Sequence, residues 1–441
     1  MMTLLEKIKN AGVIGAGGAG FPTHVKLDSK PEIIIINGAE CEPLLRVDQQ
    51  LMAVYAEELT EALEAVRAEV GAAKAIFALK GKYHSAFDAL QKTVEKYNKL
   101  SVFELDNFYP AGDEQITIYE VTGRIVPEGS IPIAVGVVVM NVETLLNIYN
   151  AMKDIPLTEK YITVTGEVKN PTTFKVPLGI SYRELIGLAG GATVSDPVLI
   201  EGGPMMGKFS DDLDKPVTKT SKGIIVLSRS HPWIAEKCRP VEVMIKQART
   251  CCCHCSLCTE VCPRNLIGHS IYPDKLMRIS TYGSMCSNDD SVTSAFLCSE
   301  CGACEIACVM GLQPYKLNNM LKAQLNKNGV KNPHKNQPET ARAFRENKKM
   351  SIGRILARTK LTSYDVPAPL KEDADIRPAK VVLPLKQHIG APSVPVVAVG
   401  TKVSAGSLVA TPPEKGLGIN IHASISGTVT AVSDKVIEIT R

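Results

Sequence analysis

Eight cysteines near the middle of the chain form two runs with the same spacing. Each run has the pattern C-x2-C-x2-C-x3-C, and Pro263 directly follows the first run. In bacterial-type ferredoxins, three cysteines of such a run ligate one [4Fe–4S] cluster and the fourth ligates the other cluster. We therefore predict two clusters that share both runs. Cluster I would be held by Cys252, Cys255, Cys258 and Cys308, and cluster II by Cys298, Cys301, Cys304 and Cys262.

Zinc is the alternative metal for such a set of cysteines. A structural zinc site needs four thiolates from paired C-x2-C knuckles, and eight thiolates in two matching runs exceed that need. Cys251 and Cys253 flank Cys252, but only Cys252 has the two-residue gap to Cys255. His254 is expected to be a solvated loop residue. The remaining cysteines are expected to be small buried residues: Cys41, Cys238 and Cys286.

A second chemical feature is a glycine-rich loop near the N-terminus, with glycines at Gly15, Gly17, Gly18 and Gly20. A dinucleotide fingerprint of this pattern follows a strand and opens a helix. Here the preceding residues look helical and a Phe-Pro pair follows, so an ordinary Rossmann site is rejected. The loop could still let backbone N–H groups approach a flat ring or a phosphate, with Lys26 as countercharge. A tight turn beside a surface lysine is the alternative.

Polar residues also gather after apolar segments, where open α/β sheets bind ligands. Ordinary solvated loop residues are the alternative interpretation. The candidates are Asn37, Glu40, Glu42, Gly112, Asp113, Glu114 and Asn141.

The elements that must position these residues suggest a multidomain protein with α/β and α+β parts. In the first segment, helical patterns (3–9, 50–70, 85–99) alternate with strand patterns (32–36, 74–79, 131–141), which predicts a layered α/β domain with a mainly parallel sheet. The segments are 1–155 (α/β), 156–232 (small α+β module), 233–325 (cysteine motifs between helices), 326–378 (linker with one or two helices) and 379–441 (short strands of a β-sandwich or barrel).

Composition excludes several classes of protein. The chain has 441 residues, of which 45% are hydrophobic, and a formal net charge of +4. That charge is too small to indicate a nucleic-acid partner. No segment approaches the ~18 apolar residues of a membrane span, so the protein is not expected to be membrane-embedded. The N-terminus has no signal-peptide core, which favours a cytoplasmic protein.

Taken together, the motifs resemble the flavin- and NADH-binding subunit of respiratory complex I and its relative in the Rnf electron-transport complex, the RnfC protein. The matching segments are 17–23 with Lys26, 37–43, 112–114 and 141–145. The resemblance implies that FMN and NADH bind at the glycine loop and the polar candidates, with Glu40 in a catalytic role. It also implies a β-grasp module of the soluble-ligand-binding type over 156–232 and a barrel-sandwich hybrid over 379–441.

The barrel-sandwich module follows the cysteine motifs, an order most similar to the cobalamin reductases of propanediol-utilization microcompartments. This resemblance implies an oxidoreductase that passes electrons from NADH through FMN and two [4Fe–4S] clusters to cobalamin as substrate. A corrinoid adenosyltransferase and shell proteins would be partners, inside a bacterial microcompartment.

Two positions depart from the complex I pattern. Ala16 replaces an arginine of the glycine loop, and Ala39 replaces an acid between Asn37 and Glu40. These losses leave open a second function, an electron-relay protein without its own NADH site. Such a protein would feed a membrane complex or a substrate reductase such as proline reductase.

Overall fold

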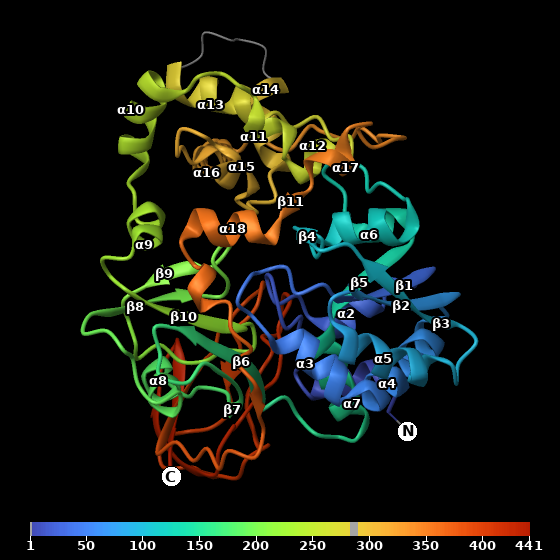
Figure 1. Ribbon diagram of the computed structural model, residues 1–441. Helices are drawn as coiled ribbons and strands as arrows, with labels where there is room; N and C mark the ends of the chain where they lie inside the picture. Colours follow the sequence, from blue (N-terminus) through green and yellow to red (C-terminus); the bar gives the residue numbers. More distant parts are fainter. Residues whose placement is uncertain (1, 283–289) are drawn as a thin grey trace.

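The computed structural model describes residues 2–282 and 290–441 (Figure 1). Its N-terminal part, the parallel-sheet region, contains four parallel strands in the order β3 (Leu100–Leu105), β2 (Lys74–Lys80), β1 (Ile33–Gly38) and β5 (Val137–Asn141). The helices of this region are α1 (Leu4–Asn10), α2 (Thr23–Leu27), α3 (Val47–Val54), α4 (Ala56–Val70), α5 (His84–Val94), α6 (Glu114–Thr122) and α7 (Val142–Met152).

Helices cover both faces of this sheet. Ile34 and Ile36 of β1 pack into a core shared with α4, α5 and α7, whereas Ile33 and Ile35 pack into a core shared with α6. Alternate residues of a strand point to opposite faces, so a strand buried on both faces is apolar at successive positions. The predicted α/β layers and parallel sheet are confirmed.

Three predicted elements of this region are wrong in part. The helix predicted over 50–70 is two helices, because Tyr55 leaves the helical conformation between α3 and α4. The strand predicted over 131–141 begins only at Val137, because residues 132–135 form a 3-10 turn, η1 (Pro132–Val135), that Gly136 ends at φ +72°. The helix predicted over 85–99 ends at Val94, and the edge strand β3 that follows was not predicted.

A second sheet, the mixed-sheet region, has six strands in the order β12-β7-β6-β10-β8-β9. Its elements are β6 (Glu159–Gly166), β7 (Thr172–Pro177), α8 (Tyr182–Leu188), β8 (Pro197–Glu201), β9 (Lys208–Ser210), β10 (Gly223–Ser228) and β12 (Leu370–Lys371). Ile162 and Leu185 of this region share one apolar core with Val381 and Ile439 of the C-terminal strands. The two parts are therefore packed as one body.

The C-terminal strands form two small sheets. One contains β13 (Lys380–Pro384), β19 (Val436–Thr440), β18 (Gly427–Val432) and β15 (Lys402–Val403), and the other β14 (Val394–Pro395), β16 (Leu408–Thr411) and β17 (Ile421–His422). A Cβ at Gly427 would lie 2.2 Å from the carbonyl oxygen of Thr440, so this close pairing requires glycine. The predicted small β-module is confirmed, although β13 and β19 were not predicted.

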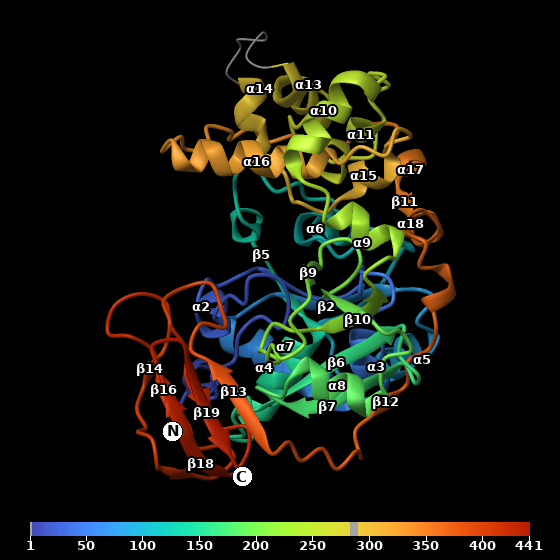
Figure 2. The ribbon, with the colours of Figure 1, turned by 90° about the vertical axis from the view of Figure 1, so that its left-hand side faces the viewer.

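The cysteine motifs lie in a helical layer, the cysteine region, on one side of both larger sheets (Figures 1 and 2). Its elements are α9 (Pro232–Lys237), α10 (Val241–Cys251), α11 (Leu257–Glu260), α12 (Pro263–Leu266), α13 (Pro273–Tyr282), α14 (Asp290–Thr293), η2 (Ser294–Leu297), α15 (Ala303–Ala307) and α16 (Pro314–Lys327). No helix in the described ranges is long and apolar enough to cross a membrane.

The segment after α16 connects all of these parts. It contains α17 (Arg345–Lys348), β11 (Met350–Ser351), α18 (Ile352–Thr359) and η3 (Thr362–Tyr364). Strand β11 pairs with β4 (Phe108–Tyr109) of the parallel-sheet region, and β12 pairs with β7. Ile355 and Leu361 are buried against Trp233 and Met205. This segment therefore contributes to the packing between regions.

Candidate functional site

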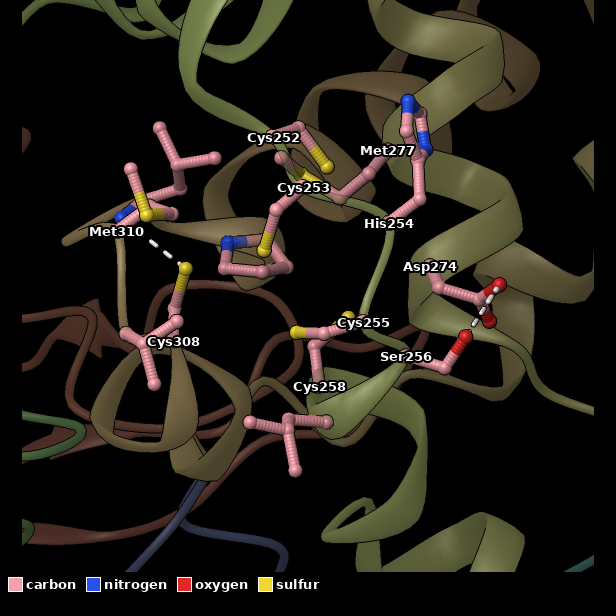
Figure 3. A pocket seen from close by; sticks show the side chains of 14 residues that line it. Cys252, Cys253, His254, Cys255, Ser256, Cys258, Asp274, Met277, Cys308 and Met310 are labelled. Atoms are coloured by element: carbon pink, nitrogen blue, oxygen red, sulfur yellow. Dashed lines mark hydrogen bonds between the residues drawn. The ribbon is translucent and has the colours of Figure 1, made fainter.

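The first predicted ligand set lines a single cavity of about 30 Å³ (Figure 3). Cys252 lies at the C-terminal end of α10, and the chain then curls through His254 and Ser256, both with positive φ, into α11. The thiols lining this cavity belong to Cys252, Cys253, Cys255, Cys258 and Cys308. The structure thus places Cys308, from the second run, with three cysteines of the first.

The second predicted ligand set is more deeply buried. Cys262, Cys301 and Cys304 are each 7–8% exposed. Burial raises the pKa of Cys262, and the neighbouring Cys301 and Cys298 raise it further. Burial and the same two cysteines also raise the pKa of Cys304. The structure therefore places Cys262, from the first run, with the second run.

Both thiol sets fit four-iron clusters better than zinc. Burial raises the pKa of Cys258 and of Cys301 to about 12, so these thiols stay protonated at neutral pH unless a metal takes the proton's place. Over residues 2–282 and 290–441, no three His, Cys, Asp or Glu side chains lie close enough to hold a single metal ion. In a cubane cluster each thiolate binds a different iron, so wider separation is expected.

The cluster II ligands lie against the parallel-sheet region. The Tyr109 hydroxyl donates a hydrogen bond of 2.5 Å to the carbonyl of Cys301. Arg264, two residues after Cys262, forms an ion pair of 2.9 Å with Asp113, and both side chains are only 12% exposed. Asp113 also caps α6 by accepting from two backbone N–H groups of its first turn. A predicted ligand-site residue thus joins the parallel-sheet region to the cluster II ligand loop.

The glycine loop has an open side and a packed side. A Cβ at Gly17 or Gly18 would meet no atom of the described residues within 4 Å, whereas one at Gly20 would lie 2.8 Å from the Thr220 side chain. Gly15 donates its backbone N–H to the Phe21 carbonyl at 3.0 Å, which closes the loop. Gly17 and Gly18 therefore leave room for a flat or anionic group to approach the backbone.

An unpartnered hydroxyl adjoins this loop. Thr23, at the start of α2, is 2% exposed, and its Oγ1 has no hydrogen-bond partner in the described chain. A buried hydroxyl without a partner is costly, so this atom fits a site that a ligand completes. Ala19 accepts a hydrogen bond of 2.8 Å from the Ile389 N–H, so the C-terminal part of the chain also borders the loop.

Lys26 already has an ionic partner. Its Nζ lies 2.7 Å from Oε1 of Glu114, and the two side chains are 31% and 40% exposed. The structure therefore brings together two predicted cofactor residues on α2 and α6. A phosphate bound by Lys26 would share the ammonium group with Glu114.

Glu40 and Glu42 make hydrogen bonds to backbone groups. Glu40 accepts from the Asp48 N–H at 2.9 Å, which caps α3, and burial and the charge of Asp48 raise the pKa of Glu40. Glu42 accepts from the N–H groups of Met205 and Met206 at 2.9 and 2.6 Å, and burial raises its pKa. Glu42 thereby links the parallel-sheet and mixed-sheet regions. The predicted catalytic role of Glu40 stays a prediction.

Asn37, Gly112 and Asn141 hold the carboxyl end of the parallel sheet together. Asn37 donates to the Gly112 carbonyl at 2.8 Å, and the Gly112 N–H donates to the sulfur of Cys41 at 2.6 Å. Asn141 caps α7 and donates to Oδ2 of Asp48 at 2.9 Å. Among the predicted polar residues, these three therefore lie at neighbouring strand ends.

The sequence interpretation missed two buried ion pairs beside these residues. Lys160 pairs with Glu143, and Lys160 also donates to the Ala16 carbonyl at 3.3 Å. Lys222 pairs with Asp48 at 2.5 Å, although the Oδ1 atom of Asp48 has no partner within the described chain. Glu143 lies within the Asn-Val-Glu-Thr motif, so its acid was a usable signal. Both lysines come from the mixed-sheet region, and nothing local in the sequence marks them.

The two alanines that depart from the complex I pattern are tightly packed. Ala16 is 1% exposed and its N–H donates to the Thr144 hydroxyl at 2.8 Å; Ala39 is fully buried. Among the other cysteines, Cys238 is exposed, so its predicted burial is wrong. Cys41 is partly buried, and Cys286 lies outside the described residues.

Four family models match successive parts of the chain. They are a Nuo51 FMN-binding domain over residues 8–150, an SLBB domain over 161–209, a 4Fe-4S dicluster domain over 251–313 and an RnfC barrel sandwich hybrid domain over 370–440. This combination defines a flavin- and iron–sulfur-containing protein of the complex I flavin-subunit and RnfC type.

Curated relatives narrow the class. The chain is 44% identical to "Cobalamin reductase PduS" of Salmonella typhimurium, over 99% of this chain and 96% of the relative, and 42% identical to the protein of that name from Citrobacter freundii, over 100% and 96%. It is 38% identical to the RnfC-type component of the Na(+)-translocating ferredoxin:NAD(+) oxidoreductase complex of Acetobacterium woodii, over 59% and 58%. The chain belongs to the family of the PduS proteins.

Proposed function

We propose that this protein is an NADH-dependent cobalamin reductase with FMN and two [4Fe–4S] clusters. The observation that carries the proposal is the contact between the two candidate cofactor regions. The Tyr109 hydroxyl on one side meets the carbonyl of a predicted cluster II ligand on the other, and Arg264 and Asp113 reinforce this contact. The full-length similarity to the PduS proteins supports cobalamin as the substrate.

In this proposal the open side of the glycine loop receives FMN. Gly17 and Gly18 leave the backbone accessible, the Thr23 hydroxyl gains a partner and Lys26 neutralises the phosphate. Asn37, Gly112 and Asn141 fix the strand ends that border the site. When bound, FMN would convert the two electrons of a hydride into single electrons, and the two clusters would carry them singly.

The cysteine region supplies the ligands. Each set combines three thiolates of one run with the fourth thiolate of the other, so the two predicted clusters depend on both runs. The cluster I thiols lie at the outer surface, where Cys255 is exposed. A large acceptor such as a corrin can approach that surface, whereas the cluster II thiols are enclosed by protein.

The main test uses anaerobically purified protein. We expect about eight irons and eight acid-labile sulfides per chain, with non-covalently bound FMN. We also expect NADH to drive cob(III)alamin reduction, followed by absorbance. Near-stoichiometric zinc without sulfide, or iron–sulfur protein that NADH cannot use to reduce cobalamin, would contradict the proposal.

The flavin site has its own test. Lys26→Ala should weaken FMN binding by about 10- to 150-fold, because a charge-assisted contact contributes roughly 1.5–3 kcal/mol. Glu114→Gln should retain FMN, since it leaves Lys26 free for the phosphate. Lys74→Ala, at the opposite end of the sheet, is the control. Unchanged flavin retention through gel filtration of Lys26→Ala would place the phosphate elsewhere.

A relay protein without an NADH site is the second candidate. The observation that favours it is the tight packing of Ala16 and Ala39, where complex I proteins carry larger charged residues. NADH added alone to the reconstituted protein distinguishes the two. Bleaching of the flavin and cluster absorbance supports the reductase, whereas bleaching only with an added flavoenzyme supports the relay.

The proposal extends to cellular context. A cobalamin reductase must deliver reduced corrin for adenosylation, so a corrinoid adenosyltransferase is the expected partner. We place the protein in the cytoplasm, inside a bacterial microcompartment whose shell proteins are further candidate partners. Co-purification of the tagged protein with an adenosyltransferase activity tests this context.

A further inference from the structure

The cavity of cluster I contains one thiol more than a four-iron cluster needs. Cys252, Cys255, Cys258 and Cys308 are the predicted ligands, yet Cys253 also lines the cavity. Figure 3 shows the sulfur of Cys253 directed into this cavity, on the side that the Cys308 sulfur enters. Cys253 therefore lies where a ligand would lie, although it breaks the two-residue spacing to Cys255.

The sulfur of Cys252 is directed differently. In Figure 3 it points toward Met277, and Cys252 packs with Met277 and Met244 in a small apolar cluster. Consecutive residues of an extended segment project to opposite sides of the backbone, and Cys252 is extended (φ −67°, ψ 110°). A rotation of the segment that turns one thiol toward the cavity therefore turns the other away.

The spare thiol is confined to the first motif. The residues that flank the corresponding cysteine of the second motif are Leu297 and Ser299, neither of which is a thiol. Cys251, on the other side of Cys252, ends α10 beside the Thr250 hydroxyl, 3.6 Å from its sulfur, and is not among the described residues that line the cavity. Cys253 alone thus combines adjacency to a ligand with access to the cavity.

We propose that Cys253 is an exchangeable ligand of cluster I that can take the place of Cys252. In the exchange, the bond between iron and the Cys252 sulfur breaks and a bond to the Cys253 sulfur forms. The proton of the Cys253 thiol ends on the released Cys252, and no iron changes its oxidation state. This inference rests on the cluster I assignment of the proposed function.

Serine variants of the full-length protein test the exchange through iron and sulfide content and the EPR spectrum of the reduced protein. Cys252→Ser should keep nearly all of about eight irons, with an altered cluster I signal, and Cys253→Ser should keep all of them. The double variant Cys252→Ser/Cys253→Ser should keep about four. The matched double variant Cys251→Ser/Cys252→Ser should behave like Cys252→Ser.

A result in which Cys252→Ser alone falls to about four irons, as low as the double variant, overturns the exchange. The cluster assignment is tested separately, since it requires about eight irons in the unmodified chain and about four in Cys255→Ser. An unmodified chain without iron overturns both the assignment and the exchange.

Alkylation of the unmodified protein tests the exchange without any substitution. Anaerobic iodoacetamide treatment of the native, iron-loaded protein should label one thiol of the 252–253 pair in each molecule. Peptide mapping should find the label on Cys252 in some molecules and on Cys253 in others. A label found only on Cys253 overturns the exchange, because Cys252 would then be bound permanently.

Discussion

The two cysteine motifs have the same spacing but lie in different surroundings. Cys255 of the first motif is exposed, and the exposed side chains of Val309 and Met310 follow Cys308 at the same cavity. Cys301 of the second motif is 8% exposed and its carbonyl accepts the Tyr109 hydroxyl. Spacing therefore sets which metal centre can form, whereas packing sets what that centre can contact.

The largest expected effect comes from removing one ligand of each set. Cys255→Ala and Cys301→Ala should each lose about four irons, and cobalamin reduction by NADH should fall steeply in both. Neither residue belongs to the parallel-sheet region, so NADH-driven reduction of a small artificial acceptor should persist near the unmodified rate. Iron content and the two rates, measured on the same preparations, check this.

The two ligand variants also separate the roles of the motifs. If only one variant loses cobalamin reduction, the other ligand set is not required for the acceptor. If both retain it, the flavin site alone suffices and the proposed use of the clusters is wrong.

The ligand sets could be predicted from sequence because their spacing is local and chemically restrictive. The same holds for the glycine loop, whose Gly17 and Gly18 border open space. The partners of Lys26 and Glu42 could not be predicted, because Glu114 and Met205 lie far along the chain. Such contacts depend on how whole regions pack.

The same limit applies to the buried charges and to one turn. Lys160 and Lys222 read as ordinary strand and loop lysines until the mixed-sheet region places them against Glu143 and Asp48. The break at Tyr55 was equally hidden, since the residues on both sides keep a helical pattern. Tertiary packing overrides local pattern at these positions.

A smaller effect is expected from controlled exposure to air. Oxygen reaches an exposed cluster more readily than one enclosed by protein, and it removes iron and leaves thiols free to oxidise. We expect the EPR signal of cluster I to disappear several-fold faster than that of cluster II. The variants Cys255→Ala and Cys301→Ala assign the two signals. Equal rates of loss would contradict the difference in burial as the cause.

The smallest expected effect concerns one ion pair beside each motif. Arg264 and Asp113 are each 12% exposed, so Arg264→Ala leaves a largely buried carboxylate unpaired and should cost about 1–3 kcal/mol locally. Arg278, 45% exposed, pairs with Asp274 at the cluster I cavity within one helix, and Arg278→Ala should cost only about 0.3–0.5 kcal/mol. Native-state hydrogen exchange measures both: amides of α6 and α12 should exchange about 5- to 150-fold faster in the first variant, and those of α13 about twofold faster in the second. Equal changes in the two variants would mean that the cluster II loop is held to the parallel-sheet region by other contacts, with Tyr109 as the first to test.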